Sequence, residues 1–165
     1  MTPKEVVQAG FDAWNRRDRD AFRSLVSDDF QFEGEPAGPD GWLAVMDVWA
    51  KAFPDNRMEI ASMIGDEEGV ACEATFTGTQ TGSLEDQQNP PLPPTGKRVT
   101  IHFATYQRVL NEKLVSFAGY GVMGSLIEAG VGGLQATVNG VPVNIHAQPS
   151  YPGTGLHQRA VAGKP

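Results

Sequence analysis

The stretch that decides the fold is Gly78-Thr79-Gln80-Thr81-Gly82, which is followed after a loop by Pro93-Pro94-Thr95-Gly96-Lys97-Arg98. Its glycines and prolines are typical of turns, because glycine tolerates positive φ and proline restricts φ. Two strand candidates, residues 99–110 and 113–123, come directly after it. We expect the stretch to form the rim, and the two strands one wall, of a pocket for a small apolar molecule.

The composition narrows the possible partners and the compartment. The chain has 165 residues, of which 13 are basic and 20 are acidic, for a net charge of -7. Since no basic cluster stands out, nucleic acid and anionic membranes are not expected as partners. The lone Cys72 excludes an internal disulfide and favours a reducing compartment. With no signal-peptide profile and no apolar run of membrane-spanning length, we expect a cytoplasmic protein.

Helix signals come first in the chain and strand signals dominate later. Thr2-Pro3-Lys4-Glu5 is a capping box that begins a helix, and a short second helix follows it. A third helix is expected over residues 40–52. Strands are predicted over residues 28–33, 57–64 and 70–79. This order predicts an α+β fold with the helices on one face of a curved, mainly antiparallel sheet.

The last part of the chain differs in composition from the rest. Residues 132–165 are rich in Gly, Pro and small side chains, and Val138-Asn139-Gly140-Val141 is a hairpin signal. We therefore divide the chain into a domain, residues 1–131, and a C-terminal extension, residues 132–165. The extension either packs on the domain or on a dimer mate, or is disordered.

Several local motifs together resemble a known family. In chain order they are Trp14-Asn15-x-x-Asp18, Ala52-Phe53-Pro54-Asp55, Gly78-Thr79-x-Thr81-Gly82, Pro93-Pro94-Thr95-Gly96-Lys97-Arg98-Val99, and Arg108-Val109 before Lys113-Leu114-Val115. This set resembles the SnoaL-like polyketide cyclases of the NTF2-like superfamily over roughly residues 3–131. The resemblance implies a conical barrel whose N-terminal helices enclose a deep apolar pocket. It also implies a homodimer and cofactor-free chemistry on polyketide-derived rings.

The sequence departs from the family at the residues expected to do chemistry. The family's Asp near the end of the last long strand falls on Gly121 or Val122, depending on the register. The family's Trp on that strand falls on Phe117 or Ala118, and the His of the Gly-Thr-x-Thr-Gly motif is Gln80. We therefore expect a pocket without the usual Asp base.

The turn between the two long strands predicts which side chains face the pocket. If Asn111-Glu112 is a two-residue turn, each residue pairs with the one equally far beyond the turn. One face is then mostly apolar and carries a few side chains that end in hydrogen-bonding groups, as ligand sites tend to do. The expected substrate-binding residues are Trp14, Phe32, Phe53, Ile101, Phe103, Thr105, Ser116, Ala118 and Val122.

Gln107 and Tyr120 on that face are the first candidates for polarising a substrate carbonyl, with Asn15 reaching in from the helices. The alternative is that Gln107 is a satisfied polar group and Tyr120 a plain wall residue. A one-residue slip in register would exchange the faces and bring His102 and Tyr106 into the pocket instead.

Other chemistries find little support in the sequence. His102, His146 and His157 lack metal-ligand spacing, so no metal is expected. The glycines of residues 78–82 match no nucleotide-binding signature, and no cofactor is expected. We interpret the lone Cys72 as a small core residue.

These observations leave two classes of function open. The first is a cofactor-independent cyclase of natural-product biosynthesis, an intramolecular lyase or isomerase, acting on a hydrophobic small molecule. Confinement and a polarised carbonyl would then replace the Asp base. The second is a non-catalytic NTF2-like protein that binds a hydrophobic ligand. A cofactor-free hydroxylase or isomerase of the same family cannot be separated from the first by sequence.

Overall fold

The computed structural model describes residues 1–85, 91–122, 125, 126, 129 and 131, and the backbone of residues 134–138 and 141–145. The helices are α1 Pro3–Arg16, α2 Arg19–Ser24 and α3 Gly38–Ala52. The strands are β1 Val26–Phe32, β2 Glu35–Pro36, β3 Arg57–Gly65, β4 Gly69–Thr79, β5 Arg98–Leu110, β6 Lys113–Tyr120, β7 Leu134–Val138 and β8 Val141–Ile145.

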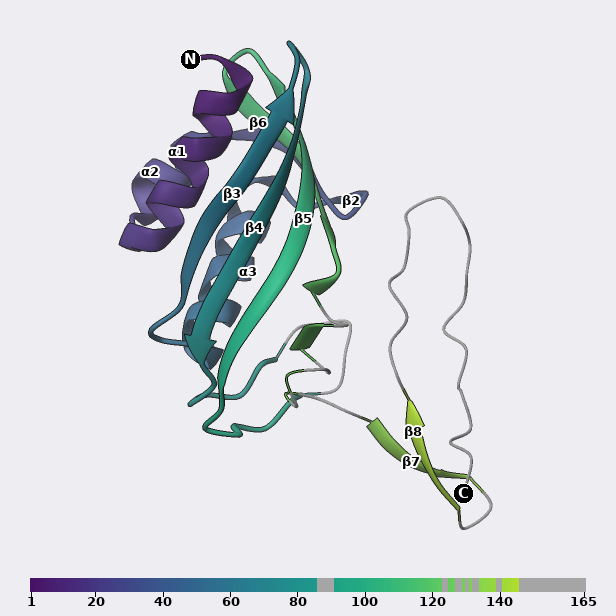
Figure 1. Cartoon of the computed structure of the whole chain (residues 1–165). Coiled ribbons are helices and arrows are strands. Elements are labelled where there is room, and N and C mark those ends of the chain that lie inside the picture. Colours follow the sequence, from purple (N-terminus) through teal and green to yellow (C-terminus); the bar gives the residue numbers. More distant parts are fainter. Residues whose placement is uncertain are drawn as a thin grey trace.

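The main layer is a six-stranded sheet in the order β2-β1-β6-β5-β4-β3, in which only the β1–β6 pair is parallel. The sheet is curved, and α1, α2 and α3 lie on one side of it (Figure 1). The predicted α+β class and the NTF2-like arrangement are confirmed. Within the described residues, no helix is long and apolar enough to cross a membrane.

The predicted capping box begins the first helix. The Glu5 backbone N–H donates to Thr2 Oγ1 at 3.3 Å, and the Thr2 N–H donates to Glu5 Oε2 at 2.7 Å. These reciprocal bonds satisfy N–H groups that the first turn leaves free. One face of this helix carries Val7, Phe11 and Trp14, which are buried.

The long strands alternate as predicted between an inner, helix-facing side and an outer side. On β4 the buried residues are Val70, Cys72, Ala74 and Phe76. On β5 the buried inner residues are Val99, Ile101, Thr105, Gln107 and Val109. The period of two places every second side chain on the core side.

The register between β5 and β6 differs from the prediction. Asn111 and Glu112 form the expected turn, both with positive φ, and Val109 pairs with Leu114. A bulge then shifts the ladder by one residue, so that Gln107 pairs with Phe117. Because a one-residue shift exchanges faces, the predicted grouping of Gln107 with Ser116, Ala118 and Tyr120 is wrong.

Aromatic rings fill the space between helices and sheet. Trp42 of α3 is at the centre of this cluster and is 6% exposed. Its ring contacts those of Phe22, Phe30, Phe32 and Phe117 at centroid distances of 5.6, 5.2, 5.3 and 4.6 Å. Such contacts add to the free energy gained by burying apolar area.

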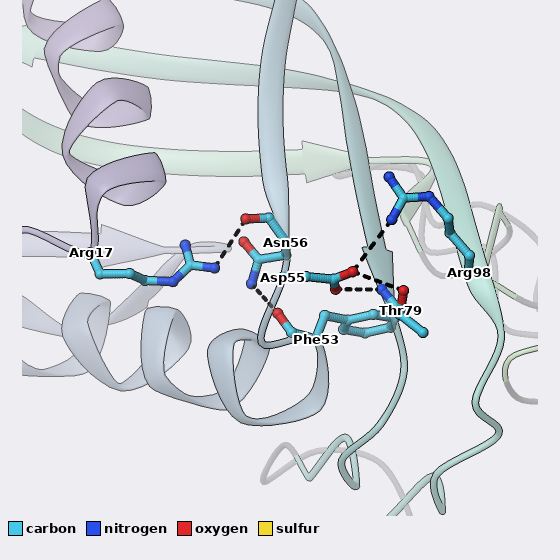
Figure 2. Close-up of polar contacts among 6 residues, drawn as sticks. All are labelled: Arg17, Phe53, Asp55, Asn56, Thr79 and Arg98. Atoms are coloured by element: carbon cyan, nitrogen blue, oxygen red, sulfur yellow. Dashed lines mark hydrogen bonds and ion pairs between the residues drawn. The ribbon is translucent and has the colours of Figure 1, made fainter.

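The side chain of Asn56 joins the helices to the start of β3. Its Oδ1 accepts from the Trp14 indole N–H at 2.8 Å, and its Nδ2 donates to the carbonyls of Phe53 at 2.8 Å and Trp49 at 3.3 Å. Its backbone carbonyl accepts from the Arg17 guanidinium at 3.0 Å (Figure 2). The buried amide thus holds the end of α1, the end of α3 and β3 together.

The neighbouring Asp55 connects the segment before β3 to the end of β4 and the start of β5. It accepts from the Thr79 backbone N–H at 2.6 Å and the Thr79 hydroxyl at 2.8 Å, and it pairs with Arg98 at 3.3 Å (Figure 2). Hydrogen bonds from Thr79 lower the pKa of Asp55. The Phe53-Pro54-Asp55 motif that supported the family resemblance therefore has a structural role.

The two halves of the rim are bonded to each other through Gln80, which is fully buried. Its backbone N–H donates to the Lys97 carbonyl at 2.8 Å, and its carbonyl accepts from the Gly96 N–H at 2.8 Å. Its side chain accepts from the Thr95 hydroxyl at 2.7 Å and donates to the Pro93 carbonyl at 3.1 Å. Gln80, at the family's His position, is therefore a structural clamp of the rim.

The predicted hairpin is present in the extension. β7 and β8 pair antiparallel, with Val138 opposite Val141, and form a two-stranded sheet of their own. The Asn139-Gly140 turn, together with His146 and His157, lies outside the described residues. Packing of this extension on the domain or on a dimer mate stays a prediction.

Asn56→Ala is expected to lower the free energy of unfolding by about 2 kcal/mol, because the buried indole N–H of Trp14 loses its acceptor and the Phe53 and Trp49 carbonyls each lose one of two donors. Chemical denaturation followed by tryptophan fluorescence measures the change. Trp14→Phe removes the donor together with part of the buried ring, and the coupling term of a double-mutant cycle separates the Trp14–Asn56 bond from that loss of packing. Strictly additive effects would contradict the assigned contact.

Asp55→Asn is expected to lower the urea midpoint at pH 7 and to have no effect in acid. The folded state holds the pKa of Asp55 below its unfolded value. Its stabilising effect is therefore present above the unfolded pKa and is lost as the pH falls through the folded pKa. Midpoints of the two proteins should converge at low pH. A gap independent of pH would show that the Asp55 charge contributes nothing.

Candidate active site on the inner face of β5 and β6

A buried polar pair interrupts the apolar inner face of β5. Thr105 and Gln107 are 2% and 3% exposed, and Gln107 Nε2 donates to Thr105 Oγ1 at 3.1 Å. Across the ladder, Thr105 pairs with Gly119 and Gln107 pairs with Phe117. These neighbours place amide and hydroxyl dipoles beside an aromatic ring and a position without a side chain.

The carboxyl group of Glu33 reaches the same part of β6 from the end of β1. Glu33 adopts a φ of 52°, and its N–H donates to the Phe117 carbonyl at 2.9 Å. Its Oε1 then accepts from the Gly119 N–H at 2.7 Å. A Cβ at Gly119 would lie 3.4 Å from Glu33 Oε1 and 3.3 Å from Phe117 Cε1. The lack of a side chain at Gly119 thus leaves room for the carboxyl group.

Burial raises the pKa of the Glu33 carboxyl group, against the opposing effect of the Gly119 N–H. Glu33 as a whole is exposed to solvent, so it lies at the open edge of the cluster, where its carboxyl group contacts the Gly119 N–H. A carboxylate with a raised pKa holds a proton more readily and is a stronger base, which suits acid–base chemistry.

The indole N–H of Trp42 completes the cluster. It is buried and has no hydrogen-bond partner among the described residues. Buried donors are nearly always paired, so an unpaired one requires an explanation. We call Glu33, Trp42, Thr105, Gln107, Phe117 and Gly119 the inner site.

Of the predicted catalytic residues Gln107, Tyr120 and Asn15, Gln107 belongs to the inner site. Asn15 instead uses its amide to bind the backbone N–H and carbonyl of Met58, at 2.8 and 2.7 Å, which clamps α1 to β3. Tyr120 pairs with Ala104 and lies on the outer side of the sheet, so its placement beside Gln107 is corrected.

The second-choice pair also lies on the outer face. His102 is exposed, and its Nδ1 is 3.1 Å from the Thr75 hydroxyl. Tyr106 is 45% exposed. An open groove on this face is lined by His102 and Tyr120 together with Glu73 and Thr75. Since the bulge affects β6 and leaves β5 in its predicted orientation, neither His102 nor Tyr106 moves inward.

The expected substrate-binding residues divide by position. Thr105 belongs to the inner site, and Phe32 stacks on Phe117 at 5.7 Å. Trp14, Phe53 and Ile101 are buried in the core.

The remaining expected substrate-binding residues are half-buried or face outward. Phe103 and Val122 are half-buried against the core cluster that contains Ile101. Ser116 and Ala118 pair with Arg108 and Tyr106 and face outward, which corrects their predicted position.

Sequence reasoning missed Glu33 as a site residue. Nothing in the linear sequence connects it to Gly119, because the link depends on the parallel pairing of β1 with β6. Trp42 was recognisable only as an apolar helix residue, since its unpaired N–H is a property of the folded core.

Comparison with known proteins identifies the family. A match to the SnoaL-like polyketide cyclase family spans residues 4–119. The chain therefore belongs to the SnoaL-like polyketide cyclase family. No curated protein matches it.

Solved structures of similar fold agree with this assignment. AclR from Streptomyces galilaeus, assigned as a hydroxylase, is 28% identical, with a TM-score of 0.62 over 77% of this chain and 94% of that chain. IdmH from Streptomyces antibioticus, assigned as a polyketide cyclase, is 20% identical, with a TM-score of 0.66 over 78% of this chain and 98% of that chain. A Catenulispora acidiphila protein with a ketosteroid isomerase-like fold is 20% identical, with a TM-score of 0.62 over 80% and 96%.

Glu33→Gln is expected to raise Tm at pH 7. Because the folded-state pKa of Glu33 is raised, its favourable effect is present below the unfolded pKa and is lost as the pH rises through the folded pKa. Gln stays neutral and can still accept the Gly119 N–H. The gain should disappear below about pH 4, where the wild-type group is protonated.

Differential scanning calorimetry across pH checks this effect, with Glu35→Gln on exposed β2 as the matched control. A lower Tm for Glu33→Gln that appears only above about pH 4 would mean that the folded state favours the charged form, and it would contradict the raised pKa.

Proposed function

We propose that the protein is a cofactor-independent cyclase of polyketide-type natural-product biosynthesis. It closes or rearranges a ring in a hydrophobic substrate without the family's usual Asp on the last long strand. The family match over residues 4–119 supports the class of reaction, and the likeness to IdmH is in keeping with it.

The observation that carries this proposal is the buried Gln107–Thr105 pair on an otherwise apolar wall. A few polar groups in an apolar site fix the orientation of a ligand. An amide N–H aimed at a ketone oxygen stabilises the negative charge that develops there during ring closure. Confinement by the aromatic rings brings the reacting carbons of one substrate together.

Two other functions have support of their own. AclR, the neighbour assigned as a hydroxylase, is 28% identical, which favours a cofactor-free hydroxylase as the second candidate. The dense packing of Phe32, Trp42 and Phe117 favours a binder of flat hydrophobic ligands as the third.

One incubation separates these functions. The purified protein is mixed with a synthetic linear aryl poly-β-ketone ester, and the products are followed by liquid chromatography and mass spectrometry. A cyclase yields a product of unchanged mass, or one that has lost water, with a new retention time. A hydroxylase yields a product with one additional oxygen atom. A binder co-purifies with the unchanged ketone.

Gln107→Leu is expected to lower the cyclisation rate by about 100-fold, since it removes a donor to the developing oxyanion while keeping a similar volume. Tyr120→Phe, on the outer face, is the matched control and should leave the rate unchanged. Initial rates with the same ketone ester check both. A large loss in Tyr120→Phe with none in Gln107→Leu would place the chemistry on the outer face.

A further inference from the structure

We propose that Glu33 is the proton acceptor of the inner site and that the Trp42 indole N–H binds the carbonyl oxygen of the substrate. This inference rests on the proposed cyclase function and assigns the residues that carry it out. Glu33, the residue after β1, would supply the carboxylate that β6 lacks.

The unpaired donor of Trp42 is the first observation. Its ring is held by four aromatic neighbours, so packing accounts for the ring but not for the N–H. By contrast, the Trp14 N–H, in the same core, is satisfied by Asn56 at 2.8 Å. A carbonyl oxygen of a bound ligand would supply the acceptor that the described protein groups do not.

The free oxygen of Glu33 is the second observation. Only Oε1 has a hydrogen-bond partner among the described residues, the Gly119 N–H, which leaves Oε2 available. That bond holds the carboxyl group in one orientation. Since burial also raises the pKa of Glu33, the ionised group is a stronger base than an ordinary Glu carboxylate.

Phe117 connects the two groups. Its ring centroid lies 4.6 Å from that of Trp42, and its Cε1 lies 3.3 Å from where a Gly119 Cβ would be, next to Glu33 Oε1. Phe32 and Phe117 are only half-buried, so theirs are the rings that a flat ligand can displace. A ketone in that place would have a donor on one side and a carboxylate on the other.

The step balances without a co-reactant. Glu33 Oε2 takes a proton from the carbon beside the ketone, and the C–H electron pair forms the C=C bond of an enolate. The charge moves to the oxygen that Trp42 binds. The enolate carbon then attacks a second carbonyl of the same substrate, and the new alkoxide takes the proton back from Glu33.

The alternative role for Glu33 is purely structural, as a cap on the β6 N–H at the end of β1. Glu33→Gln separates the two roles, because an amide oxygen can still accept from Gly119 but an amide cannot act as the base. Glu35→Gln is the matched control on β2. Trp42→Phe keeps an aromatic ring and removes the donor together with part of the buried ring, so its fold is checked as well as its rate.

The probe is 2-tetralone, a flat ketone with exchangeable protons beside its carbonyl. In D2O at neutral pH, the loss of its C1 proton signals is followed by proton NMR, and binding is followed by tryptophan fluorescence. We expect wild type and Glu35→Gln to accelerate exchange alike. Glu33→Gln should lose about 100-fold in rate with binding unchanged, as expected for loss of a general base. Trp42→Phe should lose about 10-fold or more in rate.

Exchange that is undiminished in Glu33→Gln would overturn the assignment of the base, and exchange undiminished in Trp42→Phe would overturn that of the donor. Circular dichroism checks that each variant is folded. If Glu33→Gln loses its fold together with its rate, Glu33→Asp decides: a partial rate in Glu33→Asp supports the proposal, and no rate counts against it. If exchange is catalysed but the poly-β-ketone ester is not cyclised, the proposed function fails while the site stands. If the ester is cyclised equally by wild type and Glu33→Gln, the site fails while the function stands.

Discussion

The arrangement of helices on the sheet depends on one buried amide. Asn56 follows the proline turn after α3, and its side chain takes the N–H of Trp14 and two carbonyls near the end of α3. The Trp14 N–H, which would otherwise be buried without a partner, is thereby satisfied, and the two carbonyls, which also accept from backbone N–H groups, each gain a second donor. The same turn, through Asp55, holds the ends of β4 and β5. The position of α3 over the sheet, and hence of Trp42 over Phe117, follows from this junction.

The residues at which the chain departs from the family's pattern affect how the inner site is packed. β6 carries Gly119 and ends at Tyr120, and Gly121 and Val122, which follow it, stand where the resemblance placed the family's Asp. A side chain at Gly119 would press on Phe117 and on the Glu33 carboxyl group. The small residue on one strand and the acidic residue at the end of another are therefore complementary. A carboxylate beside the aromatic cluster does not have to come from β6.

Local chemistry was enough to predict most of the fold. The capping box at Thr2, the alternation along β4 and the Asn111-Glu112 turn each act over a few residues, and each was readable in the sequence. The bulge after Val109 and Leu114 was not readable, because the extra residue is accommodated by tertiary packing and not by a turn signal. That single shift moved Tyr120 to the outer face. Gln107 and Thr105 were found because β5 keeps its alternation, whereas Glu33 needed the parallel β1–β6 pair to be known.

The parallel pairing of β1 with β6 has a consequence for the order of assembly. β1 leaves the ribosome early, yet its partner residues, Leu114 to Phe117, lie far along the chain. Closing so long a loop costs entropy that the β3–β4 and β4–β5 hairpins avoid, so these nucleate more readily. Glu33 meets Gly119 only after that final seam has closed. The contact between Glu33 and the β6 backbone is therefore expected to form late in folding, after the local hairpins.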